Sequence, residues 1–218
     1  MPTDPSLEVE RDLFAQGATC VIGVDEVGRG AIAGPVVVGV SLIREATDFP
    51  VGLRDSKLIS AKRREALVDP VREWVVATEL GEASAKEIDE FGIVSALTRA
   101  GERAFAKLAI NGHDLTGGVV LLDGTHNWLK GGLLPPLDIR VRAKADRDCA
   151  VVAAASVCAK VYRDSMMIDL SGDDDTYGWS SNKGYGSEGH FDAIREHGPT
   201  ELHRRTWLRS VSQVDAGE

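Results

Sequence analysis

Short apolar segments recur along the chain and predict about five β-strands. Three of them lie near the beginning, at Cys20–Val27, Pro35–Ile43 and Trp74–Leu80. A glycine-rich turn joins the first two, which predicts a hairpin. Two shorter runs follow at Val119–Leu122 and Ile139–Ala143, and each has the length of a buried strand.

Segments with apolar residues at helical spacing separate and follow these strands. They are Ser60–Val71, Ser84–Asn111, Asp146–Leu170 and Ser187–His197. Ser84 and Glu87 have the spacing of a capping box, and Gly198-Pro199 ends the last helix. Strands that come first and then alternate with helices predict an α/β or α+β fold. Its sheet should have an antiparallel hairpin at one side and parallel crossovers at the other.

The composition is that of an ordinary globular domain. Hydrophobic residues make up 43% of the 218 residues and charged residues 27%, which excludes a disordered, collagenous or coiled-coil chain. The longest nearly uncharged run, Ala31–Ile43, is well short of the roughly 18 to 20 residues of a membrane span. The N-terminus has acids instead of a basic leader pattern, so we expect a cytoplasmic protein. We expect one domain over residues 17–210, a flexible segment over 1–16 and a frayed tail over 211–218.

Cysteine, histidine and net charge restrict the chemistry further. The three cysteines form no Cys-x-x-Cys pair, which fits a reducing compartment and excludes a disulfide framework or a cysteine zinc site. The histidines near the C-terminus lack the spacing of a zinc-binding helix. A net charge of −9 argues against a protein that coats phosphate chains without specificity. The segment Arg54–Arg72 carries six basic residues against three acids, so a local nucleic-acid contact stays open.

Four acidic residues at predicted strand ends together have the chemistry of a divalent-metal site. They are Asp25, Glu26, Asp123 and Asp146. Taken singly, each has a structural explanation, because acids also begin solvated turns and stabilise helix N-termini. Carboxylates at the ends of adjacent strands converge on one rim of a sheet, where they suit hard cations such as Mg²⁺ or Mn²⁺. Two such ions about 3.5 to 4 Å apart can drive phosphodiester hydrolysis.

The glycines around Arg29 allow two interpretations. Gly28 to Ala33 matches the G-x-G-x-x-G/A fingerprint of dinucleotide-binding proteins, which would make the chain an oxidoreductase. That fingerprint needs a helix to begin inside it, whereas Gly34-Pro35 and the valines that follow predict a strand. In the second interpretation, the glycines bring exposed backbone N–H groups close to a phosphate or hydroxyl oxygen of a ligand.

A series of motifs extends from about Cys20 to Trp207. They are Asp25-Glu26-Val27-Gly28-Arg29-Gly30 with Ala33-Gly34-Pro35, then Leu53–Lys57, Leu122–Gly124, Lys144–Asp146, Ala153–Asp164, Asn182–Gly186 and His203–Arg205. In content and order this series resembles the motifs of type 2 ribonuclease H, the bacterial ribonuclease HII. Ala145 and Thr206 depart from the residues common in that family, Gly and Ser, but neither is one of the acids.

The resemblance implies a ribonuclease H-like mixed five-stranded sheet of antiparallel hairpin strands plus parallel strands, flanked by helices and followed by a C-terminal helical segment. It implies an endonuclease that hydrolyses the RNA strand of RNA/DNA hybrids and nicks 5′ of ribonucleotides embedded in duplex DNA. The products would carry 3′-hydroxyl and 5′-phosphate ends. We expect a monomer that binds RNA/DNA hybrid or ribonucleotide-containing DNA and no membrane. A protein that binds nucleic acid without cutting it is a third interpretation, against which the retention of all four acids argues.

The same resemblance implies roles for matched residues. The four acids correspond to the catalytic carboxylates that bind Mg²⁺ or Mn²⁺: Asp25, Glu26, Asp123 and Asp146. Gly28-Arg29-Gly30 corresponds to the loop whose backbone inspects the ribose 2′-hydroxyl. Tyr185 corresponds to the aromatic residue that packs on the sugar beyond the cleaved linkage. Lys57 and Lys183 are candidates for phosphate contacts or, alternatively, solvated surface lysines.

Overall fold

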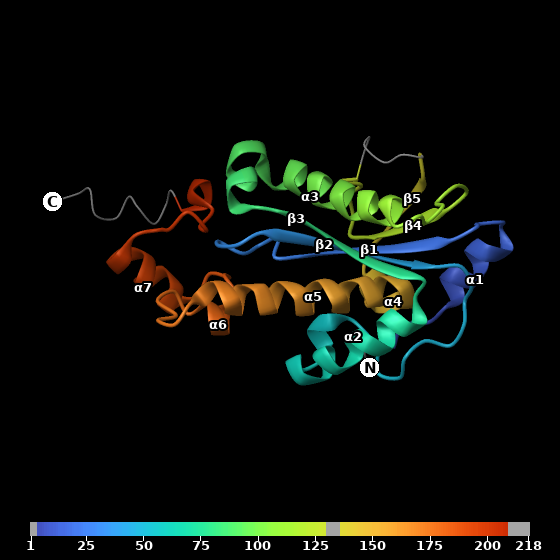
Figure 1. Cartoon of the computed structure of the whole chain (residues 1–218), viewed down its shortest axis with the longest axis horizontal. Helices are drawn as coiled ribbons and strands as arrows, with labels where there is room; N and C mark the ends of the chain where they lie inside the picture. The colour runs from blue at the N-terminus through green and yellow to red at the C-terminus, as the bar shows by residue number, and fades with distance from the viewer. Residues whose placement is uncertain (1–3, 130–135, 209–218) are drawn as a thin grey trace.

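The computed structural model describes residues 4–129 and 136–208, whose strands form a five-stranded mixed sheet (Figure 1). The strands are β1 (Val21–Val27), β2 (Val36–Ile43), β3 (Ala77–Ala83), β4 (Val119–Asp123) and β5 (Asp138–Arg142). Their order across the sheet is β3-β2-β1-β4-β5. β1 and β3 run antiparallel to β2, whereas β4 runs parallel to both β1 and β5. The C-terminal ends of β1, β4 and β5 therefore meet at one edge of the sheet, where open α/β sheets bind ligands.

Helices cover both faces of the sheet and extend beyond one end of it (Figure 1). α3 (Ala85–Ile110) packs on one face, and α5 (Ala150–Ser171) packs on the other, with α2 (Ala61–Trp74) against it. The other helices of the described residues are α1 (Glu8–Ala15), α4 (Ala145–Asp148), α6 (Trp179–Asn182) and α7 (Glu188–His197), besides the short 3-10 turns Ser56–Leu58 and Arg205–Trp207. Figure 1 shows α6 and α7 near the C-terminal end of α5. The expected mixed sheet, flanking helices and C-terminal helical segment are confirmed.

The period-two pattern of β1 divides the hydrophobic core into two layers. Ile22 and Val24 belong to the layer between the sheet and α3, whereas Val21 belongs to the layer between the sheet and α5. At Gly23 the helix α5 comes so close that an added Cβ would lie 2.4 Å from the backbone carbon of Val151. The absence of a side chain at this position is therefore what lets α5 pack directly over β1.

The alanine-rich segment forms two helices instead of the single expected helix over Asp146–Leu170. α4 and α5 are separated at Cys149, where the backbone is extended. The cause is a contact from the N-terminus, because Ser6 pairs with Cys149 as a β-bridge and its N–H donates to the carbonyl of Asp148 at 3.0 Å. Glu10 of α1 also accepts a hydrogen bond from the N–H of Val151 at 3.0 Å. The spacing of apolar residues within the segment does not indicate that Ser6 pairs with it.

A helix lies in the described part, residues 4–16, of the segment over 1–16 that was expected to be flexible. Residues 8–15 form α1, and Leu7 and Leu13 are buried against the domain. Two other boundaries also move: α2 continues to Trp74, and β3 begins at Ala77 instead of Trp74. The N–H of Val75 donates to the carbonyl of Val71 at 3.0 Å, so the last hydrogen-bonded turn of the helix includes residues 72–74. The expected tail over 211–218 lies outside the described residues, and the boundaries of the domain remain a prediction.

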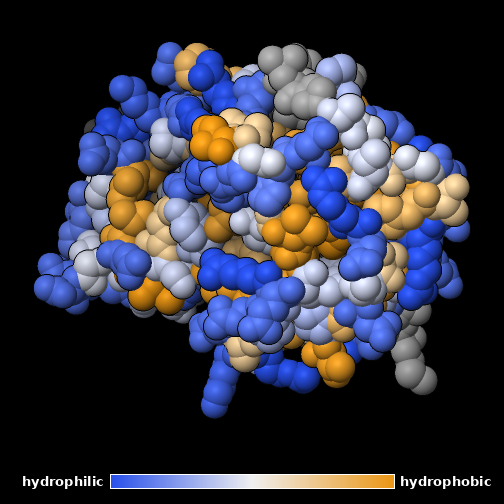
Figure 2. Space-filling model, turned by 45° about the vertical axis from the view of Figure 1, so that its right-hand side comes forward, coloured by the Kyte–Doolittle hydropathy of each residue, from blue (hydrophilic) through white to orange (hydrophobic). Residues whose placement is uncertain are grey.

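The surface and the cysteines agree with the compositional argument. The face shown in Figure 2 carries hydrophobic patches interspersed among hydrophilic residues. Within the described ranges, the helices are too short or too polar to cross a membrane. Cys20, Cys149 and Cys158 are free and buried.

Candidate active site

The four candidate carboxylates come together at the edge where the parallel strands end. Asp25 lies in β1 and Asp123 ends β4, and the residues just before them, Val24 and Leu122, are register partners. Glu26 is the next residue of β1, and Asp146 lies on α4, which follows β5. The charges of the other three acids all act on Asp25, so the cluster expected from the sequence is present.

Burial distinguishes this cluster from a set of surface acids. Asp25 is only 3% exposed and Asp146 only 4%, so Asp25 does not begin a solvated turn. Asp25 Oδ1 accepts a hydrogen bond from the N–H of Glu26 at 2.8 Å. Asp123 Oδ1 accepts one from the N–H of Ala145 at 2.7 Å, which ties the end of β4 to the start of α4. The carboxylates are therefore held by elements that are themselves packed into the domain.

Burial is also the main cause of the raised pKa values in the cluster. It raises the pKa of Asp25 to about 8, while a hydrogen bond from Ser156 opposes the shift and the neighbouring acids add to it. It raises the pKa of Asp146 to about 6, with Asp123 adding and Lys57 opposing. Burial likewise raises the pKa of Glu26. These shifts mean that removal from water disfavours the charged form of these carboxylates, and that a bound cation would favour it.

Lys57 directs its ammonium group toward this cluster. Its Nζ lies 3.7 Å from Asp146 Oδ2, although its side chain is 72% exposed. Burial lowers the pKa of Lys57, but the charges of Asp25, Asp146 and other acids outweigh burial and raise it overall. The backbone N–H of Lys57 donates to Asp55 Oδ1 at 2.9 Å, which holds the residue at the start of its 3-10 turn. Lys57 is thus both close to the acids and accessible from outside.

The donor set suits a divalent cation that binds together with its substrate. Glu26 Oε2 is buried and has no hydrogen-bond partner among the residues that the structure describes, which leaves an oxygen available to a cation. In the part of the chain that the structure describes, no three Asp, Glu, His or Cys side chains are arranged to hold an ion. Mg²⁺ commonly takes only one or two carboxylates and completes its shell with waters and substrate phosphates. The residues that could hold such an ion are Asp25, Glu26, Asp123 and Asp146.

The connection between β1 and β2 is a glycine loop and does not begin a helix. β2 starts at Val36, so the dinucleotide fingerprint lacks its helix and the oxidoreductase interpretation is rejected. Gly28 has a φ of +83°, and a Cβ there would lie 1.9 Å from Arg163 Nε. Both facts require glycine at this position. In the described residues no hydrogen-bond acceptor is present for the backbone N–H groups of Arg29 and Gly30.

Two buried arginines donate hydrogen bonds to the backbone carbonyls of this loop. The motifs of the sequence did not predict this role for either of them. Arg163 on α5 donates to the carbonyls of Ala33 at 3.1 Å and Pro35 at 2.9 Å. Arg204 donates to the carbonyls of Gly28 at 2.7 Å and Arg29 at 2.8 Å. For Arg163, the only indication in the sequence was the presence of a charged residue in a predicted alanine-rich helix. No local signal separates the buried Arg204 from the exposed arginine that follows it.

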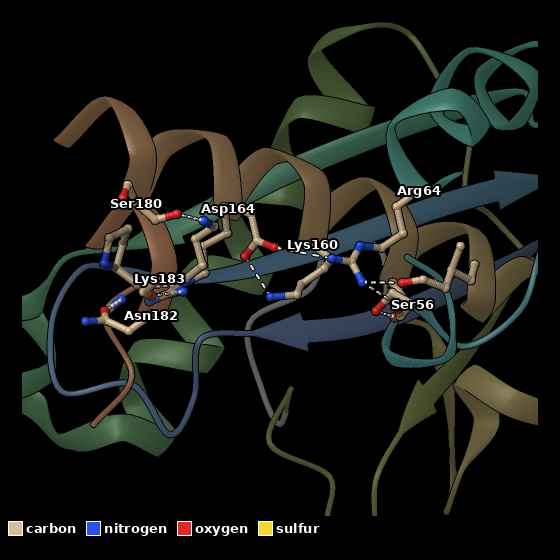
Figure 3. A network of polar contacts seen from close by, with 12 residues as sticks. Ser56, Arg64, Lys160, Asp164, Ser180, Asn182 and Lys183 are labelled. Carbon is tan, nitrogen blue, oxygen red and sulfur yellow. Dashed lines mark hydrogen bonds and ion pairs between the residues drawn. The ribbon is translucent and has the colours of Figure 1, made fainter. Parts of the chain in front are cut away.

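Tyr185 lies beside the glycine loop, whereas the ammonium group of Lys183 does not. Tyr185 is 37% exposed, and its ring centroid lies 5.4 Å from the guanidinium carbon of Arg163. The preceding residue, Gly184, accepts hydrogen bonds from the N–H groups of Ile32 and Ala33. Lys183 donates its ammonium hydrogen to the carbonyl of Ser180 (Figure 3). Of these two residues, only Tyr185 presents a side chain at the loop.

A polar network links α5, α2 and the 3-10 turn at Ser56 (Figure 3). Lys160 pairs with Asp164 at 2.7 Å, and Arg64 of α2 lies 3.6 Å from the second oxygen of Asp164. Arg64 also donates to the carbonyl of Ser56 at 2.6 Å. The hydroxyl groups of Ser156, which also contacts Asp25, and of Ser56 are hydrogen-bonded to each other at 2.9 Å. The 3-10 turn that carries Lys57 is therefore anchored to α2 through Arg64 and to α5 through Ser156.

Comparisons of sequence point to one family. The family model described as Ribonuclease HII matches residues 22–210. A protein named Ribonuclease HII from Streptomyces coelicolor is 45% identical over 209 residues, which cover 95% of this chain and 85% of that protein. Its namesake from Streptomyces avermitilis is 44% identical over 209 residues with the same coverage.

Solved structures of related proteins share the fold. The ribonuclease H2 from Pyrococcus horikoshii OT3 matches with a TM-score of 0.70 and 28% identity, over 88% of this chain and 96% of that one. A structure of the PCNA:RNase HII complex from Archaeoglobus fulgidus matches with a TM-score of 0.67 and 24% identity, over 86% and 94%. The structure of Bst-RNase HIII in complex with Mn²⁺ matches with a TM-score of 0.63 and 21% identity, over 88% and 68%. The last two likenesses concern the fold alone.

Proposed function

This chain belongs to the ribonuclease HII family, and from that membership we propose that it is an endonuclease for RNA/DNA hybrids and for DNA that contains ribonucleotides. It hydrolyses the RNA strand of a hybrid and nicks duplex DNA on the 5′ side of an embedded ribonucleotide. The products carry 3′-hydroxyl and 5′-phosphate ends. The observation that carries this proposal is the cluster of four carboxylates, two of them almost fully buried, at the C-terminal edge of the sheet.

The four carboxylates would bind the divalent cations on which the reaction depends. When bound, Mg²⁺ or Mn²⁺ activates a water nucleophile and stabilises the charge that develops on the phosphodiester. Either ion suits oxygen donors. Asp25, Asp123 and Asp146 come from β1, β4 and α4, which are packed against one another. These side chains would therefore hold the cations at fixed positions beside the reacting phosphate without a large rearrangement of the backbone.

The Gly28-Arg29-Gly30 loop would distinguish ribose from deoxyribose. Arg204 holds the carbonyls of Gly28 and Arg29 from inside, and the N–H groups of Arg29 and Gly30 lack an acceptor within the described part of the chain. A 2′-hydroxyl both donates and accepts hydrogen bonds, so it can bind such groups where a deoxyribose cannot. The exposed ring of Tyr185 would pack on the sugar beyond the cleaved linkage.

Lys57 and Lys183 would contribute differently to phosphate binding. The Lys57 ammonium group is exposed and lies near Asp146, so it can contact a phosphate close to the reacting group. The Lys183 ammonium group contacts the Ser180 carbonyl, so it must leave that contact before it can bind a phosphate. We therefore propose a direct phosphate contact for Lys57 and a weaker, peripheral one for Lys183.

The test is digestion of a DNA duplex that contains a single ribonucleotide, with Mg²⁺, with Mn²⁺ and with EDTA. We expect one nick on the 5′ side of the ribonucleotide in the presence of metal, and ends that a ligase and a polymerase recognise as 5′-phosphate and 3′-hydroxyl. An all-DNA duplex of the same sequence is the substrate control and should stay intact. Binding without cleavage under all metal conditions would support the interpretation of a nucleic-acid-binding protein that does not cut.

A further inference from the structure

Two buried histidines lie behind Tyr185 and the glycine loop, and the proposed function gives them no role. His190 is on α7 and His203 is in the segment that follows it, and they are 0% and 1% exposed. Their Nε2 atoms are 3.1 Å apart. The rings of Tyr177 and Trp179 pack around them, with the Tyr177 centroid 4.7 Å from that of His203. The two histidines thus form a closely packed pair that solvent does not reach.

The partners of this pair determine the direction of each hydrogen bond. The backbone N–H of Thr200 donates to His203 Nδ1 at 3.0 Å, and the indole N–H of Trp179 donates to His190 Nε2 at 3.1 Å. Backbone and indole N–H groups can only donate, so His203 carries its proton on Nε2 and His190 carries its proton on Nδ1. His203 then donates to His190 Nε2, which it shares as an acceptor with the indole N–H of Trp179, and His190 donates to the carbonyl of Tyr185 at 2.9 Å. One directed chain of hydrogen bonds runs from Thr200 to Tyr185.

This chain of hydrogen bonds requires both rings to be neutral, and their surroundings favour that state. Burial lowers the pKa of His190 and lowers that of His203 to about 4, where the charges of His190 and Arg205 add to the effect. A second proton on either ring would place two donors face to face. The pair is therefore a neutral structural contact.

The histidine pair lies where the turn of Tyr185 meets the glycine loop. His203 pairs with Ala33 as an antiparallel bridge, and the next residue, Arg204, donates to the carbonyl of Gly28 at 2.7 Å. On the other side, His190 donates to Tyr185, whose neighbour Gly184 accepts from the N–H of Ala33 at 3.1 Å. A change in the separation of the two rings would therefore change the separation of Tyr185 and the loop.

We propose that His190 and His203 are positioning residues, whose hydrogen-bonded pair sets the distance between the Tyr185 ring and the Gly28–Gly34 loop. The pair would thereby control how well the ribose-containing strand fits, without touching it, since both rings are buried. This inference rests on the proposed function, because it concerns the same substrate site.

Asn and Gln substitutions at the two positions test the directed chain. The Asn amide lies near the place of the His Nδ1 atom, and the Gln amide lies near that of Nε2. His190→Asn therefore keeps the donation to Tyr185, whereas His190→Gln loses it. At the other position the preference is reversed, because His203→Gln keeps the donation to His190 and His203→Asn does not.

We expect kcat/KM on the single-ribonucleotide duplex to be higher for Asn than for Gln at position 190, and higher for Gln than for Asn at position 203. The poorer variant at each position should lose at least about tenfold, mainly through KM, because the strand is misplaced while the carboxylates are not. If the histidines only filled space, the larger Gln would be the better replacement at both positions. That order would overturn the proposal.

A double variant shows whether the histidines affect cleavage through Tyr185 or through a general effect on folding. In a Tyr185→Ala background, the loss caused by His190→Gln should largely disappear, because both changes remove the same contact of the ring with substrate. Losses that multiply would contradict the proposal. Thermal unfolding of each variant shows whether it is folded at the assay temperature.

Ring ¹⁵N NMR of the free wild-type protein tests the hydrogen-bond chain without any substrate. We expect the proton on Nδ1 of His190 and on Nε2 of His203, and any other tautomer would overturn the proposal even if a variant failed to fold. A protein with these tautomers that leaves the ribonucleotide duplex uncut would contradict the proposed function instead. In that case the Kd for the duplex replaces kcat/KM, and the same reversed order of Asn and Gln is required.

Discussion

Replacement of Asp25 by Asn should stabilise the metal-free protein increasingly as the pH rises. Asp25 is 3% exposed, and burial raises its pKa from 3.8 to about 8. Between these pH values the unfolded chain carries a charged Asp25 while the folded protein keeps it protonated. The folded state then binds more protons than the unfolded state, so the free energy of unfolding falls as the pH rises. Asn has the same shape, can still accept from the N–H of Glu26 and does not titrate.

The size of the effect follows from the shift in pKa. Each unit corresponds to about 1.4 kcal/mol, so between pH 5 and pH 8 the wild-type protein should lose up to about 4 kcal/mol that Asp25→Asn retains. This is an upper value, since Asp146 titrates in the same cluster and shares the protons. The advantage of Asn should level off above pH 8, where Asp25 becomes charged in both states.

Urea unfolding in EDTA at several pH values between 5 and 8 measures this difference. Asp173→Asn, on an exposed loop, is the control for the same substitution outside the core. Added Mg²⁺ or Mn²⁺ should return stability to the wild-type protein at pH 8, because the ion compensates the carboxylates. A difference between Asp25→Asn and wild type that stays constant from pH 5 to pH 8 would refute the reasoning. The variant should also lose nearly all cleavage, and near wild-type turnover would remove Asp25 from the metal site.

Three further variants test other parts of the molecule. Tyr185→Ala should reduce kcat/KM on a single embedded ribonucleotide more than on a continuous RNA/DNA hybrid, because its contact matters most where ribose meets deoxyribose; equal losses would withdraw that role. Gly28→Ala should lower the free energy of unfolding by about 1 to 3 kcal/mol, because φ of Gly28 is +83° and Arg163 occupies the space that the added Cβ would need. Gly30→Ala is the control: nothing lies within 4 Å of its Cβ position, so the free energy of unfolding should not fall. Ser84→Ala removes an N-cap that accepts from Glu87 N–H at 3.2 Å and should cost about 1 kcal/mol in urea unfolding while leaving cleavage unchanged.

The fold was largely predictable because most of its elements are encoded locally. The β-branched runs of β1 and β2 and the capping box at Ser84 identify their elements within a few residues. Errors arose where a distant segment decides the backbone. Cys149 is extended because Ser6 pairs with it, and α1 is ordered because Glu10 and its neighbours pack against the start of α5.

The acids of the candidate site were predictable for a related reason. Asp25 and Asp123 end apolar runs that have the length of strands, and strands that run parallel bring such residues to one edge. The residues that support them were not predictable in this way. Ser156 and Arg163 lie in a helix whose periodicity shows that they share a face with buried alanines, but not that this face meets Asp25 and the glycine loop.

The sequence by itself thus determined the strands, the long helices, the four acids and the family, because each depends on residues that are close together or on motifs in a characteristic order. Tertiary structure alone decided which polar side chains are buried, and with which partners. His190 and His203 are separated in sequence from the glycine loop, and Arg204 reaches Gly28 across 176 positions. The physical reason is that a buried donor must find an acceptor somewhere in the fold. Its position along the chain carries no information about which acceptor that is.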